Sequence, residues 1–381
     1  MKIFPAEAVK QIDTYTIENE PITSTNLMER AASRLKDWFV RYYRVNRRVV
    51  VLAGPGNNGG DALALARMLS ARQYRVECCV VSSSGKLSGD CTVNLERLEQ
   101  QGKVPISRVK TTGDFPVINR NDVVVDGLFG SGLTRVVEGV YKELIEYLNN
   151  SGATVISVDI PSGLFGEDNR ENDPSAIVRA DYTLTFQFPF LSFFFVENEQ
   201  YTGQWNVLDI GLHPLIIERT NTRYSTISRQ QVAGLLPERK KFSHKGTFGN
   251  ALAISGSSGM MGAALLTGQA ALRSGTGLVT LHVPRSGFRV VQTAFPEAIV
   301  SLDNNEDLFS MPPDVEKYSA VAVGPGLGTS QESMKGLQML LENVKVPLVI
   351  DADALNMISE NREMISMIPP GTILTPHPLE F

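Results

Sequence analysis

The sequence predicts an α/β protein of two units, each built on a mostly parallel sheet covered by helices. Its 381 residues are more than one ordinary hydrophobic core needs. Strand and helix patterns alternate through the first half, and such alternation is typical of parallel sheets with helices on both faces. Strands that lead into glycine loops recur in the second half.

The first half opens with two predicted helices within residues 5–45. Ser24 or Thr25 is expected to cap the second helix, which has Leu27 and Leu35 on its apolar face. Strands are predicted at 48–53, 75–81, 122–126, 154–159 and 181–186, and helices at 61–72, 90–101 and 138–150. The most apolar run, 184–196, is expected to form a core strand and hairpin.

Residues Val49–Ala64 are the centre of this half, because a buried strand, a glycine turn and a helix start follow one another there. The unpaired N–H groups of a helix start favour anions and nucleotides. Gly54 to Gly59 fit the G-x-G-x-x-G pattern, which is a weak signal alone. Asp61 in the first helical turn would repel a pyrophosphate, and no acidic residue follows the second strand, so an ordinary NAD dehydrogenase is disfavoured. The alternative is a glycine turn that only packs a helix.

Polar side chains follow three of the predicted strands. Asn58 and Asp61 come after the first, Asp126 ends another, and Asp159 and Ser162 follow a third. Ligands bind at the carboxyl ends of parallel strands, so these side chains predict one site. Oxygen ligands of this kind suit a hard cation. Each aspartate has an alternative role as an ordinary turn or capping residue.

The second half begins after a polar stretch, with a boundary expected near residue 220 and hence domains at 1–220 and 221–381. Strands are predicted at 250–255 and 278–283 around a small-residue helix at 263–273. Further strand and glycine-loop patterns lie at 320–328 and 346–355. The pattern does not repeat that of the first half.

Composition excludes several classes of protein. A net charge of −5 gives no basic patch for nucleic acid. Cys78, Cys79 and Cys91 lack C-x-x-C spacing, which favours buried reduced thiols in a cytoplasmic protein. The four histidines form no metal pattern, and no run suggests a signal peptide or a membrane span. The oligomeric state is left open, and a homo-oligomer is compatible with the sequence.

Three motifs of the first half, GPGNNGGDALALA, VVVDGLFGSGL and SVDIPSGL, resemble the epimerase domain of NAD(P)H-hydrate repair enzymes. The resemblance covers about residues 1–215 and implies a Rossmann-like three-layer α/β/α domain. It implies that the domain interconverts the R and S forms, at C6, of NADH or NADPH to which water has added across C5–C6.

The same resemblance implies roles for individual residues. Asp159 would be the catalytic acid or base, and Asn58, Asp126 and Ser162 would hold a potassium ion. The substrate would contact Asp159 together with Asn57, Asn58, Gly59, Gly60, Asp61, Gly130, Ser131, Gly132, Leu133, Thr134, Arg135 and Val136. One departure is Ala62, where the family has glycine, and a methyl group there is expected to be a mild change.

The second half resembles the ADP- or ATP-dependent NAD(P)H-hydrate dehydratase, a ribokinase-like enzyme, through HKGTFGN, SGSSGMMGAA, ALRSGTGLV, GPGLG, IDADAL and TPHP. The resemblance covers about 225–381 and implies ADP or ATP with Mg²⁺ as cofactor. Ala263, Gly326 and His377 would contact the S-form hydrate. Leu379 departs from the family's TPHPGE motif. The sequence ends before the family's nucleotide loop and catalytic aspartate, so dehydration by this chain alone is not expected.

Two other functions stay open at this point. The first domain would be a nucleotide-binding scaffold if its Asn and Asp loops only held a ligand. The second domain would alternatively make the chain a sugar or vitamin kinase with a regulatory first domain, although the nucleotide loop that such a kinase needs is missing from this sequence.

Overall fold

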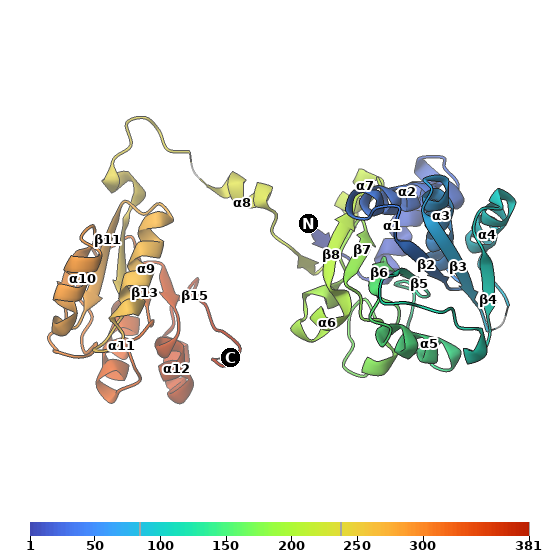
Figure 1. The fold of residues 1–381 in the computed structure, drawn as a ribbon. Coiled ribbons are helices and arrows are strands. Elements are labelled where there is room, and N and C mark those ends of the chain that lie inside the picture. The colour runs from blue at the N-terminus through green and yellow to red at the C-terminus, as the bar shows by residue number, and fades with distance from the viewer. Residues whose placement is uncertain (84, 237, 381) are drawn as a thin grey trace. The chain divides into compact units, whose positions relative to one another are not determined.

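A computed structural model describes residues 1–83, 85–236 and 238–380. The chain divides into two compact units, Met1–Leu236 and Pro237–Phe381 (Figure 1). This division lies beyond the boundary predicted near residue 220. The reason is that β9 (Tyr224–Ser225) pairs with β1 (Lys2–Ile3), while α7 (Pro214–Arg219) contacts α1 (Ala6–Asn19). Much of the expected linker is therefore part of the first unit.

The first unit is built on a parallel sheet of seven strands in the order β4-β3-β2-β5-β6-β7-β8. The chain runs outward in one direction from β2 to β4 and then in the other from β5 to β8, so β2 and β5 flank the point where the order reverses. Such a point opens a crevice at the carboxyl ends of the strands. The strands are β2 (Arg48–Ala53), β3 (Arg75–Val81), β4 (Ile106–Val109), β5 (Val123–Gly127), β6 (Thr154–Val158), β7 (Tyr182–Phe186) and β8 (Gln204–Leu208).

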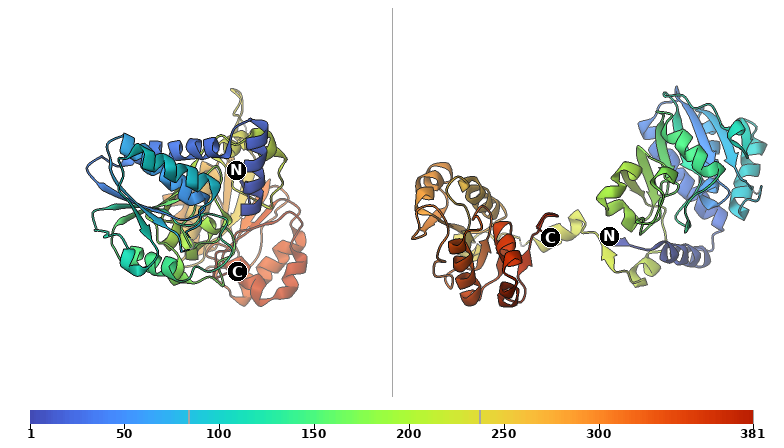
Figure 2. Two further views of the ribbon diagram at one scale, coloured as in Figure 1. Left: turned by 90° about the vertical axis from the view of Figure 1, so that its right-hand side faces the viewer. Right: turned by 90° about the horizontal axis from the view of Figure 1, so that it is seen from below.

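Helices cover both faces of this sheet (Figures 1 and 2). On one face, α2, α3 and α4 bury Leu35, Leu63 and Leu95 against the strands, and on the other face α5 buries Leu144. This confirms the predicted three-layer α/β class. The helices are α2 (Ser24–Tyr42), α3 (Asn57–Ala71), α4 (Gly89–Gln101), α5 (Val140–Asn149) and α6 (Glu199–Thr202). The cap of α2 is Thr23, rather than the predicted Ser24 or Thr25, because the Thr23 hydroxyl accepts a hydrogen bond from the Asn26 N–H.

The predicted hairpin at 184–196 is wrong. β7 ends at Phe186, and short 3₁₀ turns follow at Leu191–Phe194 and Val196–Asn198. The aromatic side chains of this run do not alternate between two faces. Phe188 packs on Phe4, whereas Phe190 and Phe193 enter a different cluster. Pro189 between them has no N–H to donate to a strand ladder.

The second unit has a parallel six-stranded sheet in the order β12-β11-β10-β13-β14-β15. Helices α9 and α10 pack on one face, and α11 and α12 on the other. Its elements are β10 (Asn250–Ile254), β11 (Leu278–Val283), β12 (Ile299–Leu302), β13 (Ala320–Val323), β14 (Leu348–Ile350), β15 (Ile373–Leu374), α9 (Met261–Arg273), α10 (Phe288–Ala294), α11 (Gln331–Asn343) and α12 (Asp353–Glu360); α8 (Arg229–Leu235) precedes them.

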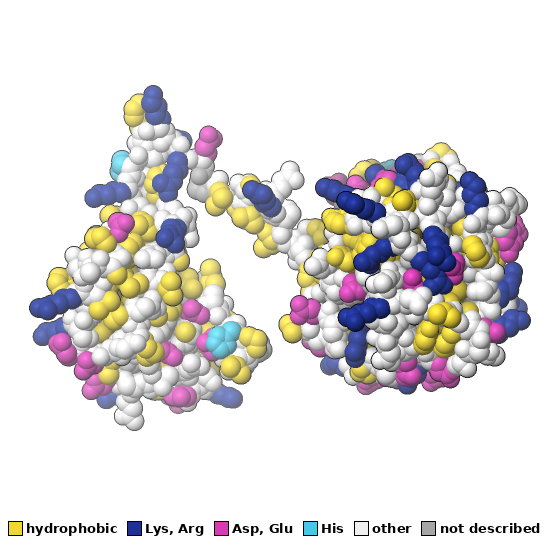
Figure 3. All heavy atoms as spheres, in the orientation of Figure 1, with side chains coloured by type: hydrophobic (Ala, Val, Ile, Leu, Met, Phe, Trp, Pro, Cys, Tyr) yellow, Lys and Arg dark blue, Asp and Glu magenta, His cyan; other side chains and the backbone are white. Residues whose placement is uncertain are grey.

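Hydrophobic side chains gather on the face of the second unit that Figure 3 shows, where α9 lies in Figure 1. On that helix, Met261 and Ala264 are buried, while Leu266 is 71% exposed. None of the described helices combines the length and the apolar character that crossing a membrane requires.

Candidate active site

The glycine turn after β2 brings the start of α3 close to two strands. A Cβ atom on Gly59 would lie 1.9 Å from the Gly54 carbonyl oxygen, and one on Gly54 would lie 1.8 Å from the Leu128 carbonyl oxygen. Only glycine fits such approaches. The helix begins at Asn57, so Asn57–Asp61 form its first turn. Ala62 is fully buried in the core, so its methyl group is accommodated there.

Asp126, at the end of β5, is the centre of a buried hydrogen-bond network. Its carboxylate is 0% exposed and accepts bonds from the Ser157 hydroxyl at 2.7 Å, the Ser162 hydroxyl at 2.6 Å and the Ser162 N–H at 2.9 Å. Burial raises the pKa of Asp126, and the hydrogen bonds from Ser162 oppose that rise. The network joins the ends of β5 and β6.

Asn58 reaches the same place from α3. Its amide donates to the Phe129 carbonyl oxygen at 2.8 Å, and the Ser162 hydroxyl lies 3.2 Å from that oxygen. Asn58 and Ser162 thus meet at the Phe129 carbonyl, and the Ser162 hydroxyl links them to Asp126. They provide amide, carboxylate, hydroxyl and carbonyl oxygens, all of them hard donors. No cationic side chain of the described residues pairs with Asp126, so the donor set fits a cation.

Asp159 follows β6 in a strained turn. Its φ is +64°, and the Ile160 N–H donates to the Val158 carbonyl at 2.8 Å, which makes Asp159 the central residue of a γ-turn. This turn type is rare and costs free energy. The carboxylate accepts hydrogen bonds from the Thr185 hydroxyl at 3.3 Å and the Phe186 N–H at 3.2 Å. The tight turn directs this side chain toward the end of β7.

Burial raises the pKa of Asp159 to about 6, against the opposing effect of its hydrogen bonds from Phe186, Thr185 and Ser131. Asp61, in the first turn of α3, is only 9% exposed. Its pKa is raised well above the ordinary value, mainly by burial and secondly by the negative charge of Asp159. Among the described residues, no group donates a hydrogen bond to the Asp61 carboxylate. Carboxyl groups with pKa values near neutrality are suited to acid–base chemistry.

The structure adds a carboxylate that the sequence did not reveal. Asp13, on α1, has its pKa raised to about 7 by burial and by the negative charge of Asp159. The sequence pattern of α1 shows an amphipathic helix but nothing that ties it to the strand ends. Because α1 precedes the sheet in the chain, only the tertiary packing brings Asp13 to the other acids.

Only part of the loop at 130–136 lies at the site. A Cβ atom on Gly130 would lie 3.2 Å from the Asn58 Cβ, and Ser131 hydrogen-bonds Asp159. Leu133 and Val136 instead pack against the hydrophobic cluster under α5. The side chains of that pair therefore do not join the carboxylates. Gly132, Thr134 and Arg135 are exposed.

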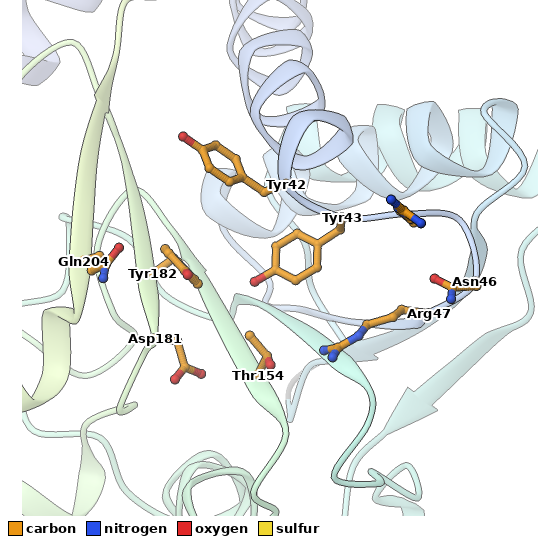
Figure 4. A pocket seen from close by; sticks show the side chains of 9 residues that line it. Tyr42, Tyr43, Asn46, Arg47, Thr154, Asp181, Tyr182 and Gln204 are labelled. Atoms are coloured by element: carbon orange, nitrogen blue, oxygen red, sulfur yellow. The ribbon is translucent and has the colours of Figure 1, made fainter.

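A separate cavity of 580 Å³ lies at the other end of the sheet (Figure 4). It is lined by Thr154, Tyr182 and Gln204, the first residues of β6, β7 and β8, and by residues at the end of α2 and just after it. Parallel strands present their carboxyl ends to the opposite rim. The polar residues that the sequence singles out are therefore remote from this cavity.

In the second unit, the structure brings together two of the three predicted contact residues. A Cβ atom on Gly326, whose φ is +69°, would lie 2.9 Å from the Ala263 Cβ on α9. His377 lies after β15, where its side chain is 61% exposed and its Nε2 is 2.9 Å from a Glu380 carboxylate oxygen. Among the described residues, no hydrogen bond or ion pair links His377 to Ala263 or Gly326.

Comparisons with known proteins agree with the two-unit organisation. A family described as YjeF-related protein N-terminus matches residues 24–191, and one described as NAD(P)H-hydrate dehydratase matches residues 251–381. The bifunctional NAD(P)H-hydrate repair enzyme of Thermofilum pendens is 34% identical over 390 residues, which cover 99% of this chain and 73% of that protein. The chain belongs to the family of bifunctional NAD(P)H-hydrate repair enzymes.

Other members of this family are similarly related. The Escherichia coli enzyme is 31% identical, over 94% of this chain and 67% of its own length. A crystal structure of the ADP/ATP-dependent NAD(P)H-hydrate dehydratase from Bacillus subtilis, co-crystallised with ATP and Mg²⁺, is 33% identical with a TM-score of 0.34 and covers 40% of this chain and 53% of that one. The two family matches and the Thermofilum pendens relative confirm the family that the motifs predict, whereas the individual site residues stay predictions.

Proposed function

We propose that the first unit epimerises hydrated NADH and NADPH at C6, and that the second unit is of the type that dehydrates the S form with ADP or ATP and Mg²⁺. The observation that supports the epimerase activity is a pair of carboxylates with raised pKa values, the buried Asp61 at the start of α3 and the half-buried Asp159 just after β6. Family membership supplies the substrate class.

Inversion at C6 requires proton transfer to and from oxygen. The C6 carbon carries a hydroxyl group and is bonded to the ring nitrogen, so the hydroxyl leaves as water when an acid protonates it. Water then adds to the planar carbon from the other face while a base takes its proton. Asp159, with its pKa near 6, is partly protonated at neutral pH and can serve either step.

Asn58, Asp126 and Ser162, with the Phe129 carbonyl, are the residues that would hold potassium. When bound, the ion supplies a fixed positive charge that offsets the buried Asp126 carboxylate. The hydrogen bonds between Asp126 and Ser162 tie the loop after β6 to the loop after β5. The residues of this network position the Asp159 turn relative to the first turn of α3.

In the second unit, the face of α9 at Ala263 and the adjoining Gly326 loop are the proposed contact surface for the S-form hydrate. The loop can approach the helix because Gly326 adopts a positive φ and has no Cβ. We include His377 in this proposal only through the family motif. An exposed imidazole beside Glu380 is free to change partners when a substrate binds.

The test is epimerisation of purified R-hydrate by the full chain without nucleotide. A separate active dehydratase, added in excess, reports formation of the S form. We expect R-hydrate to disappear faster than by its spontaneous exchange, and Asp159→Asn to remove most of the acceleration. Glu167→Gln, an exposed change in a nearby loop, is the matched control. Exchange at the spontaneous rate would instead indicate a binding module without catalysis.

A further inference from the structure

The cavity at the amino ends of β6, β7 and β8 has the size of a ligand site. Its volume is 580 Å³, and small-molecule sites measure about 300–1,000 Å³. Thr154, in its wall, is the first residue of β6, and Asp159 follows the last, so the two are separated by the length of that strand, roughly 15 Å. A ligand in this cavity would therefore lie apart from the carboxylates of the candidate active site.

Two arginines give the cavity a positive charge that the protein does not neutralise. Arg44 and Arg47, just after α2, both line it. Neither side chain forms an ion pair or a hydrogen bond with any residue that the structure describes, whereas the neighbouring Arg48 pairs with Glu77 and Asp122. Guanidinium groups favour phosphate in particular, because each can donate two parallel hydrogen bonds to its oxygens. The charge of the cavity therefore suits an anionic ligand.

Aromatic rings form another part of the wall. Tyr42, Tyr43 and Tyr182 line the cavity, and the ring of Trp38 lies against all three, with centroid distances of 4.6, 6.2 and 5.2 Å. The indole N–H of Trp38 is buried and has no hydrogen-bond partner within the described parts of the chain, so packing alone positions this ring. Aromatic side chains stack on flat rings such as nucleic-acid bases. This part of the wall suits a planar group.

Asp181 supplies a hydrogen-bond acceptor. One of its carboxylate oxygens accepts from the Val155 N–H at 2.8 Å, and the other has no donor among residues 1–83, 85–236 and 238–380. Figure 4 shows the Arg47 guanidinium group and the Tyr43 hydroxyl group directed toward this carboxylate. Burial is the main cause that raises the pKa of Tyr43 to about 12, so its hydroxyl keeps its proton at neutral pH and can donate. A carboxylate of this kind can hold the hydroxyl groups of a ribose.

We propose that this cavity is a second ligand site of the first unit and that it binds a mononucleotide, with the phosphate on Arg44 and Arg47, the base on the tyrosine rings and the ribose hydroxyls on Asp181. A mononucleotide joins these three chemically different groups in one small molecule. Inorganic phosphate would use the arginines alone, and a nucleoside would use only the rings and the carboxylate. The inference does not depend on the proposed epimerase function, since the residues that line the cavity are not those of the candidate active site.

The experiment titrates the full chain with AMP, adenosine and inorganic phosphate and follows tryptophan fluorescence, because Trp38 packs on the tyrosines of the cavity. We expect a saturable change with AMP, and weaker binding of adenosine and phosphate. Arg44→Gln and Arg47→Gln should each weaken AMP binding about tenfold, as the loss of a hydrogen bond to a charged group does. Arg34→Gln, a change of an exposed arginine on α2, is the matched control and should bind AMP like the wild type. Circular dichroism confirms that each variant is folded.

Equilibrium dialysis of labelled AMP detects binding that leaves the fluorescence unchanged. AMP binding that neither arginine substitution weakens, or no binding by either method at millimolar AMP, would overturn the inference. Phosphate binding as tight as that of AMP would reduce the cavity to an anion site. Asp159→Asn should leave the AMP titration unaltered, and a loss of binding in that variant would place the nucleotide at the candidate active site instead. Epimerisation is assayed separately, so its absence would refute the proposed function without affecting this inference.

Discussion

Removing the charge of Asp13 should change how the stability of the first unit depends on pH. The folded-state pKa of this residue is about 7, against an ordinary value of 3.8. For a group whose pKa is raised by folding, the stabilising contribution is complete below the unfolded pKa and is lost as pH rises through the folded pKa. The wild-type unit should therefore lose stability between about pH 4 and pH 7.

The magnitude follows from the same values. One pKa unit is about 1.4 kcal/mol, so the full rise corresponds to roughly 4 kcal/mol. Asp13 is only partly buried and is coupled to Asp159, so we expect about 2–4 kcal/mol to be measured. Asn resembles the protonated acid. Asp13→Asn should match the wild type near pH 4 and exceed its free energy of unfolding by that amount at pH 8.

The assay is urea unfolding of the full chain at several pH values, followed by tryptophan fluorescence. Both tryptophans, Trp38 and Trp205, lie in the first unit, so the signal reports that unit alone. Glu18→Gln controls for the loss of an exposed charge from α1. Parallel stability curves for the wild type and Asp13→Asn from pH 4 to pH 8 would show that folding does not raise the pKa of this carboxyl group.

Three further results are expected. Asp126→Asn should weaken any potassium dependence of epimerisation, measured by replacing potassium with a bulky organic cation, and an unaltered dependence would contradict the proposed ligand set. Gly59→Ala should destabilise the first unit by about 3 kcal/mol or more in urea unfolding, because its methyl group would overlap the Gly54 carbonyl oxygen; wild-type stability would show that α3 can shift. Cys78 and Cys91 are buried with raised thiol pKa values, so a thiol reagent at pH 8 should modify them only after unfolding, and rapid reaction of the native chain would disprove this.

Much of the fold could be predicted because strand and helix patterns are local. The predicted strands at 48–53 and 75–81 coincide with β2 and β3, whose apolar residues are buried on both faces. β4 and β8 were not predicted, since Ile106–Val109 and Gln204–Leu208 lie at the sheet edges and carry polar residues. An edge strand has one partner and a mixed surface, so its sequence resembles a loop.

The candidate site likewise contains residues that the sequence predicted and features that it did not. Asn58, Asp126 and Ser162 each follow a strand directly, so the strand-end rule predicted that they would be close, and the structure brings them together. Asp13 could not be found by that rule, because α1 reaches the site only through nonlocal packing of its apolar face. The strain at Asp159 was equally hidden, since its positive φ depends on the neighbouring strand β7 and not on a glycine in the sequence.

The pairing of β1 with β9 has a consequence for engineering the first unit. The Met1 ammonium group and carbonyl oxygen both hydrogen-bond Thr226, and the Lys2 ammonium group donates to three carbonyl oxygens at the end of α7. The beginning of the unit's chain therefore lies beside residues 224–226, which precede α8 and the end of the unit at Leu236. A circular permutant that joins Thr226 to Met1 through a short linker and opens the exposed turn near Gly113 would keep every strand of the seven-stranded sheet in place.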